Sequence, residues 1–385
     1  MKVALVHDYL IQDGGAERVL LVLHEIWPDA PIFTLYHDPK RVGPAFDGMD
    51  IRPSILQKMP FALRHYKWTL PLMPAATEYY DLSGFDVVIS STSAFAKGVI
   101  TRPDTLHICY CHTPTRYLWT DTQEYVASLR LGPLMRRFVL SFLSRLRVWD
   151  RLAADRVDRF VANSETVAER IRKYYRRDSV VIHPPVETRR LSPTGLPGEY
   201  YLAGGRLVPY KRIDLVVEAF NNLGLPLRVF GEGPELEKLK ASAKPNIIFV
   251  GKVSEKEKSE LYRNAIAYIH PQEEDFGITA VEAMAAGRPV IAYRRGGATE
   301  TVVDGETGEF FDEQSADALA RAVRRLRPAD FDHTVIRRHA EKFSKEIFVA
   351  KMKEFVETSW REYPRHSPDA AKEEVVRAVV NGISL

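Results

Sequence analysis

Two glutamates separated by seven intervening residues are the strongest chemical signal in the chain. Glu274 and Glu282 enclose the segment DFGITAV, which follows an apolar run that ends at His270. The pattern predicts a helix from about Ile278 to Gly287, and a helix N-terminus binds phosphate through its unpaired N–H groups and positive dipole end. Carboxylates beside an anion suit a ligand that presents hydroxyl groups on both sides of its phosphates. The spacing therefore predicts a nucleotide-sugar site, with Glu282 near a ribose and Glu274 near sugar hydroxyls.

Three further motifs in the second half fit the same site. Gly204-Gly205-Arg206 follows a predicted strand, and Lys211 comes five residues after Arg206. The arginine guanidinium, which can form two parallel hydrogen bonds, and the lysine ammonium are therefore available to bind a diphosphate. Gly231-Glu232-Gly233-Pro234 and Gly296-Gly297-Ala298-Thr299-Glu300 also follow predicted strands, at the sheet edge where doubly wound folds bind ligands. Each motif has an alternative interpretation, as solvated surface for the basic residues and as a plain tight turn for the glycines.

The first half carries a glycine pair and a histidine at strand ends. Gly14 and Gly15 follow the first predicted strand, but a G-x-G-x-x-G fingerprint is absent, which argues against a nicotinamide enzyme. Asp38 follows the second strand, and without that fingerprint it fits better as a helix or turn cap. His112 ends the strand HICYCH before a Thr-Pro turn. We expect its side chain to project into a cleft, although a lone histidine is usually structural.

Short apolar runs alternate with helical patterns, which is typical of parallel sheets built from βα units. We predict strands at Lys2–Val6, Pro31–Leu35, Asp86–Ser90, His107–Cys111, Arg159–Ala162, Val180–His183, Tyr200–Ala203, Leu227–Phe230, Ile247–Val250, Ala267–His270, Pro289–Ala292 and Gly308–Phe311. Helical patterns include Ala16–Ile26, Ser164–Tyr174, Ile213–Asn222, Ser254–Asn264, Ala316–Leu326 and the region Phe343–Tyr363. Ser254 begins a capping-box sequence. Pro184–Glu199 is rich in Pro and Gly and predicts a linker, with a possible last helix at Ala370–Val380.

Composition narrows the class of protein. A chain of 385 residues with 45% hydrophobic and 27% charged residues predicts a globular protein of two domains. The net charge of +3 is too small to indicate nucleic-acid binding. No run of 18 apolar residues and no cleavage site after the N-terminal strand are found, so neither a spanning segment nor a signal peptide is expected. Cys109 and Cys111 are expected to be buried free thiols on one strand face.

The motifs GGRLVPYKRIDL, GEGP, the two glutamates and GGATETVVDGETG occur in an order that resembles the retaining GT-B glycosyltransferases of family 4. This resemblance implies an α/β fold of two Rossmann-like domains whose parallel sheets face across a cleft. We expect an acceptor domain at 1–190, a nucleotide-sugar domain at 191–345, and C-terminal helices at 346–385, the first crossing back to the N-terminal domain.

The resemblance also implies roles for the residues of both halves. Arg206, Lys211 and the backbone of Gly277, Ile278 and Thr279 would hold the donor diphosphate, and Glu282 would hold the ribose. Glu274, Phe276 and His112 would contact the transferred sugar. The base would lie near Gly251, Lys252 and Val253, and Gly14 and Gly15 would approach the acceptor and the phosphates. The family generally needs no metal, and no Asp-x-Asp is found at a strand end.

The segment CHTPTRYLW and the EEDFGITAVEA form of the donor motif resemble bacterial mannosyltransferases of O-antigen or exopolysaccharide synthesis. That resemblance favours GDP-mannose as donor and a polyprenyl-diphosphate-linked saccharide as acceptor, with no cofactor beyond the donor. A UDP-sugar-dependent transferase and a GT-B-type sugar-nucleotide epimerase are the rival enzymes. A non-catalytic nucleotide- or nucleic-acid-binding module is disfavoured, because the basic residues cluster with apolar ones and form no stacking groove.

A basic amphipathic segment suggests contact with a membrane surface. Leu134–Trp149 contains Arg136, Arg137, Arg145 and Arg147 and no acid, with Phe138, Phe142 and Leu146 at helical spacing. Such a helix suits an anionic membrane, and Phe61–Met73 is a second apolar-basic stretch. The alternative is that both segments pack on the core. We expect a cytoplasmic protein, peripheral on the inner face of the cytoplasmic membrane.

Overall fold

The computed structural model describes residues 1–60, 63–129, 131–191, 193 and 198–363, and within these the chain forms two compact units. Among the described residues, the first unit comprises those within 1–163, 167–182 and 349–363, and the second comprises those within 164–166 and 183–348. The expected boundary at 190 thus falls inside the second unit. Part of the expected linker 184–199, part of 61–73 and the whole of the expected helix 370–380 lie outside the described residues.

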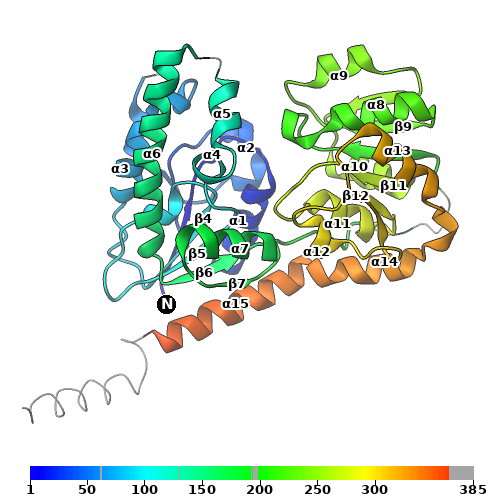
Figure 1. Cartoon of the computed structure of the whole chain (residues 1–385). Coiled ribbons are helices and arrows are strands. Elements are labelled where there is room, and N and C mark those ends of the chain that lie inside the picture. The colour runs from blue at the N-terminus through cyan, green and yellow to red at the C-terminus, as the bar shows by residue number, and fades with distance from the viewer. Residues whose placement is uncertain (61–62, 130, 192, 194–197, 364–385) are drawn as a thin grey trace, which may run out of the picture. The chain divides into compact units, whose positions relative to one another are not determined.

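The first unit is built on a parallel sheet of seven strands in the order β3-β2-β1-β4-β5-β6-β7. Most of its strands are buried on both faces, as expected where helices cover a parallel sheet (Figure 1). Their bounds are β1 Val3–His7, β2 Ile32–Thr34, β3 Ile51–Pro53, β4 Val87–Thr92, β5 Leu106–Cys111, β6 Arg159–Ala162 and β7 Ser179–Val181. The α-helices are α1 Gly15–Ile26, α2 Pro39–Val42, α3 Met73–Glu78, α4 Arg116–Trp119, α5 Thr122–Ser128, α6 Pro133–Asp155 and α7 Glu165–Tyr175. Short 3-10 turns are η1 Pro44–Phe46, η2 Ile55–Lys58, η3 Tyr66–Leu72 and η4 Ala96–Gly98.

The second unit repeats the same strand order in a parallel sheet of six strands, β10-β9-β8-β11-β12-β13. The strands are β8 Tyr200–Gly204, β9 Leu227–Phe230, β10 Ile247–Gly251, β11 Ala265–His270, β12 Val290–Tyr293 and β13 Gly308–Phe311. The helices are α8 Ile213–Leu223, α9 Leu236–Ser242, α10 Glu255–Arg263, α11 Ile278–Ala285, α12 Ala298–Thr301, α13 Ala316–Arg325 and α14 His333–Ala340, with turns η5 Pro209–Lys211, η6 Pro328–Asp330 and η7 Glu341–Phe343. The last described helix, α15 Lys345–Glu362, begins in this unit and continues in the first.

Each sheet reverses its strand order beside its first strand, between β1 and β4 and between β8 and β11. In doubly wound folds, ligands bind outside the carboxyl ends of the strands at such a reversal. The loops after β1, β4, β8 and β11 are therefore the ones on which a site is expected.

All twelve predicted strands are present, with ends that differ by no more than two residues. The strand that the sequence did not reveal, β3, lies at the sheet edge, is mostly exposed and contains Pro53, so its pattern is weak. Ser254 forms the predicted capping box with Glu257, and Asp38 caps α2. Cys109 and Cys111 are buried free thiols in one cluster.

The structure of α6 shows that part of the membrane-helix prediction is wrong, because three of the residues assigned to the membrane face point toward the protein. Leu146 is buried and Phe142 partly buried against a hydrophobic cluster, so these two side chains face the protein. Arg147 also faces inward, because its Nε donates to the backbone oxygen of Leu118 at 2.6 Å and its guanidinium lies over the Trp119 ring. Arg136, Arg137 and Arg145 are exposed. The exposed apolar residues are Leu134, Met135, Phe138, Val148 and Leu152.

A buried carboxylate fixes α6 to the core of the first unit. Asp150 on α6 pairs with Lys97 Nζ at 2.6 Å, and both side chains are 1% exposed. Three further donors reach the same carboxylate, at 2.8 Å from Thr115 Oγ1, 2.8 Å from Trp119 Nε1 and 2.9 Å from Tyr175 OH. Burial opposes the charge of Lys97, but the Asp150 carboxylate raises the pKa of Lys97 above its usual value. All donors of the cluster converge on one carboxylate.

Candidate active site

The second unit brings Lys211 and Glu274 into an ion pair at the strand-order reversal. Lys211 ends η5, in the segment after β8, and Glu274 lies on the loop after β11. Lys211 Nζ contacts Glu274 Oε1 directly, and the two side chains are 13% and 17% exposed. A cation suited to phosphate and a carboxylate suited to hydroxyl groups therefore lie together before the N-terminus of α11.

Backbone contacts between neighbouring loops hold Glu274 in place. Gly297 N donates to Glu274 O at 2.8 Å, and a Cβ on Gly296 would come within 2.3 Å of that oxygen. On the other side, Leu207 N donates to Glu232 O at 2.8 Å. The loops that carry the predicted glycine motifs therefore pack against neighbouring loops: Gly296-Gly297 against the Glu274 loop, and the Glu232 loop against Leu207. A larger residue at position 296 would collide with the Glu274 backbone, so the close contact requires glycine.

Helix α11 begins at Ile278, as the sequence predicted, and ends at Ala285. Gly277 is its N-cap in a left-handed conformation, φ +92°, which glycine adopts without strain. Phe276 is buried, and its ring stacks on His183 of the same unit. Since the first four N–H groups of a helix lack intrahelical partners, the turn at Gly277, Ile278 and Thr279 is suited to bind an anion.

Glu282 lies one turn inside α11 and is buried. Its Oε1 accepts from Lys258 Nζ at 2.9 Å and its Oε2 from Tyr262 OH at 3.0 Å, both on α10. The carboxylate therefore links two helices, which the sequence did not reveal. An ionised carboxylate can accept about four hydrogen bonds, so this role is compatible with a ribose contact.

His270 and Gln272 belong to this site but were not singled out from the sequence. His270 is fully buried at the end of β11, and its Nδ1 accepts from Gln272 Nε2 at 3.2 Å, which leaves the ring proton on Nε2. That Nε2 lies 3.8 Å from Glu274 Oε2. Burial, together with the Lys211 charge, lowers the pKa of His270 to about 3, so the ring is neutral at pH 7. The available signal was its position as the last strand residue before the loop.

The remaining residues expected in the donor site lie on neighbouring loops. Arg206 is exposed after β8. Gly251 O accepts from Gly231 N at 2.7 Å, Lys252 is exposed, and Val253 packs against the hydrophobic core. Their proposed contacts with diphosphate and base stay predictions.

Among the described residues, the Glu300 carboxylate forms no hydrogen bond or ion pair with the predicted donor-site residues, although its motif was expected at the ligand-binding edge of the sheet. Its carboxylate accepts from the backbone N of Glu165 at 2.7 Å and of Thr166 at 2.9 Å, and it lies 3.7 Å from His183 Nε2. Burial opposes the charge, but His183 and these N–H groups lower the pKa of Glu300. The residue fixes chain segments of the second unit.

In the first unit, Gly14 is the extended N-cap of α1 and Gly15 its first residue. His112 follows β5 and is half-buried, with Nε2 at 2.8 Å from Ser91 Oγ. Asp8, after β1, accepts from the backbone N of Ala94, Phe95 and Ala96, so its carboxylate fills the anion site at the start of η4.

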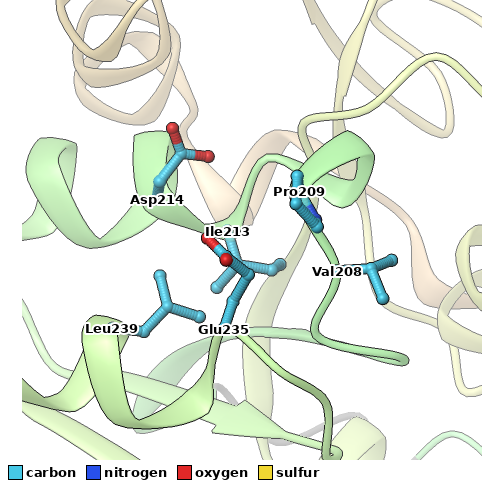
Figure 2. A pocket seen from close by; sticks show the side chains of 6 residues that line it. All are labelled: Val208, Pro209, Ile213, Asp214, Glu235 and Leu239. Carbon is cyan, nitrogen blue, oxygen red and sulfur yellow. The ribbon is translucent and has the colours of Figure 1, made fainter. Parts of the chain in front are cut away.

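A small pocket beside η5 is lined by other residues. Val208, Pro209, Ile213, Asp214, Glu235 and Leu239 line it (Figure 2). None of the predicted donor-site residues lines this pocket. Within the part of the chain that the structure describes, no three His, Cys, Asp or Glu side chains are grouped so as to hold a metal. The expectation that no metal is needed stays a prediction.

Comparisons with known proteins agree with this architecture. Residues 14–190 match the family model "Glycosyltransferase Family 4", and residues 190–342 match "Glycosyl transferases group 1". The GDP-mannose-dependent alpha-(1-6)-phosphatidylinositol monomannoside mannosyltransferase of Mycolicibacterium smegmatis is 34% identical over 31% of this chain and 36% of its own. The alpha-1,3/1,6-mannosyltransferase ALG2 of Dictyostelium discoideum is 23% identical over 80% of this chain and 85% of its own. Anabaena HepE, solved in complex with UDP, has a TM-score of 0.67 at 15% identity, covering 93% of this chain and 100% of that one.

The fold is that of the GT-B glycosyltransferases, with two parallel-sheet α/β domains. The two family models together span residues 14–342, and the chain belongs to the family 4 glycosyltransferases. It spans about half the length of several curated relatives, 58%, 44% and 36% in three of them.

Proposed function

We propose that the protein transfers mannose from GDP-mannose to a polyprenyl-diphosphate-linked saccharide in cell-surface polysaccharide synthesis, with retention of configuration. The observation that carries the proposal is the Lys211–Glu274 pair before the N-terminus of α11. It joins a phosphate-binding cation, a carboxylate for hydroxyl groups and a helix end at the place where this fold binds ligands.

The donor diphosphate would take Lys211, Arg206 and the N–H groups of Gly277, Ile278 and Thr279. Glu282 would hold the ribose, and Gly251, Lys252 and Val253 would lie near the base. Glu274 and His112 would bind hydroxyl groups of the transferred sugar, beside Phe276, and Gly14 and Gly15 would approach the acceptor.

The proposed chemistry needs no covalent intermediate on the protein. The acceptor hydroxyl attacks the anomeric carbon from the side on which the diphosphate departs, and the leaving phosphate oxygen accepts the hydroxyl proton. Lys211 and the positive end of α11 stabilise the charge that develops on the phosphate. The protein would thus act mainly by positioning and electrostatic stabilisation.

The choice of GDP-mannose is supported by the names of relatives that use GDP-mannose or transfer mannose. The structure of HepE with UDP and glucose supports the rival, a UDP-sugar-dependent transferase. A sugar-nucleotide epimerase of this fold would convert its substrate without consuming an acceptor.

A donor panel tests the proposal and its rivals. The purified protein is incubated with GDP-mannose, UDP-glucose, UDP-N-acetylglucosamine and other nucleotide sugars, and release of nucleoside diphosphate is followed without acceptor. We expect slow hydrolysis of GDP-mannose above all others. Fastest hydrolysis of a UDP-sugar would show that the donor is a UDP-sugar and not GDP-mannose. An epimerised product would show that the protein is an epimerase and not a transferase. No turnover of any nucleotide sugar would contradict the proposal.

We further propose that the protein is cytoplasmic and docks on an anionic membrane surface through α6. Leu134 is 82% and Phe138 69% exposed on this helix, beside the exposed Arg136 and Arg137. Exposed apolar side chains flanked by arginines suit the boundary between headgroups and acyl chains. Trp68, on η3, is 82% exposed, and η3 packs against the same hydrophobic cluster as α6. No helix among the described residues is long and apolar enough to cross a membrane.

Flotation with vesicles tests this docking. We expect binding to vesicles rich in anionic lipid and a loss of at least about 30-fold in Arg136→Glu/Arg137→Glu, because each basic residue near such a surface contributes about 1 kcal/mol. The matched control is Arg321→Glu/Arg324→Glu, which reverses two exposed charges on α13 of the other unit. Equal flotation of both variants, or flotation that ignores anionic lipid, would contradict the proposal.

A further inference from the structure

Four polar side chains form a connected series in the first unit, from Glu17 through His7 and Ser91 to His112. His7 ends β1, Ser91 stands opposite it on β4, and His112 follows β5. His7 Nδ1 lies 3.0 Å from Ser91 O and 3.2 Å from Ser91 Oγ, and Ser91 Oγ lies 2.8 Å from His112 Nε2. Glu17, His7 and Ser91 are buried, and His112 is half-buried.

The direction of these hydrogen bonds follows from the Ser91 carbonyl. Because a carbonyl oxygen only accepts, the proton of His7 must be on Nδ1. The same N–H also points toward Ser91 Oγ, so this oxygen accepts from His7 and its own proton is available for His112 Nε2. When Ser91 donates this proton, His112 Nε2 is the acceptor and the neutral His112 ring carries its proton on Nδ1.

Glu17 lies at the other end of the series, beside His7. With Nδ1 protonated, His7 Nε2 faces Glu17 Oε1 at 3.9 Å, an attractive arrangement when a proton lies between the two groups. The second oxygen of Glu17, Oε2, is buried without a hydrogen-bond partner among the described residues and is 2.8 Å from where a Cβ on Gly14 would lie. The carboxylate is thus packed beside the Gly14-Gly15 turn.

We propose that Glu17, His7 and Ser91 are positioning residues that hold His112 as its Nδ1–H tautomer. A neutral histidine side chain in water prefers the other tautomer, so this state requires the hydroxyl of Ser91 at Nε2. The His112 ring then presents an N–H donor on the side away from Ser91. That this donor binds a hydroxyl group of the transferred sugar rests on the proposed function, whereas the tautomer does not.

Nitrogen-15 NMR of the full-length protein, labelled at histidine, tests the tautomer directly. The His112 signals are assigned by their loss in His112→Gln. We expect a protonated Nδ1 and an unprotonated Nε2 in the wild type, and a shift toward protonated Nε2 in Ser91→Ala. A wild-type His112 protonated on Nε2, or a spectrum unchanged by Ser91→Ala, would overturn the inference.

Kinetics of donor turnover test the consequence. Ser91→Ala and His7→Phe should lower kcat by roughly 10- to 100-fold, the cost typical of removing a group that orients a functional histidine, with little change in KM. His7→Asn should recover part of this loss, because its amide N–H can replace Nδ1–H toward Ser91 O. Recovery would not be expected if His7 only filled space, so equal losses in His7→Phe and His7→Asn would contradict a positioning role. If the tautomer responds as expected but no nucleotide sugar is turned over, the proposed function fails and the inference on the ring stands.

Discussion

Glu274→Ala is expected to lower turnover of the best nucleotide sugar by roughly 100- to 1,000-fold, the effect typical of removing one group preorganised for the transition state. The variant loses the carboxylate proposed to hold the sugar. It also releases Lys211 from the ion pair. Binding of the nucleoside diphosphate alone, which has no sugar, should therefore stay the same or become tighter, as measured by calorimetry.

Glu273→Ala is the matched control, because it removes an exposed carboxylate from the neighbouring position of the same loop. Its turnover should remain within about twofold of the wild type, as expected for a surface change of at most ~0.5 kcal/mol. Unchanged turnover in Glu274→Ala would refute the site assignment. Loss of diphosphate binding in that variant would show instead that Glu274 supports the phosphate site and does not compete with phosphate for Lys211.

Asp150→Ala is expected to destabilise the first unit by about 3–5 kcal/mol, because it leaves the Lys97 charge buried without its partner. Thr115, Trp119 and Tyr175 lose their acceptor as well. Faster hydrogen exchange in α6 and a lower urea midpoint, followed by the fluorescence of Trp119 and Trp149, would report the loss.

Asp155→Ala provides the comparison on the same helix, since Asp155 is exposed and pairs with Arg151 at the surface. A surface pair contributes about 0–1 kcal/mol, so this variant should resemble the wild type. The double variant Lys97→Met/Asp150→Leu should recover much of the stability, because it removes both charges. If Asp150→Ala were no less stable than Asp155→Ala, the buried cluster would not anchor α6.

The sequence predicted the architecture well because hydrophobic periodicity follows local structure. Buried parallel strands are continuous apolar runs, and the glycine-rich loops at their ends identified the place of Glu274 and the start of α11. The edge strand β3 was missed because it is exposed and short.

Side-chain partners were harder to predict, since they depend on residues far apart in the chain. Glu282 is bound by Lys258 and Tyr262, and His7 by Ser91, and no spacing rule connects these positions. The amphipathic pattern of α6 likewise identified a helix but could not tell that Phe142 and Leu146 face the protein while Leu134 and Phe138 face outward.

The path of the chain has a practical consequence for engineering. The first unit is completed by residues 349–363, where Met352 and Val356 are fully buried and Tyr363 OH donates to Pro103 O at 3.3 Å. A gene fragment that ends at residue 182 would omit these side chains and expose the apolar surface they cover. Chimeras that exchange the N-terminal half with that of a relative should therefore transfer α15 in the same step, because two separate stretches of the sequence form this one unit.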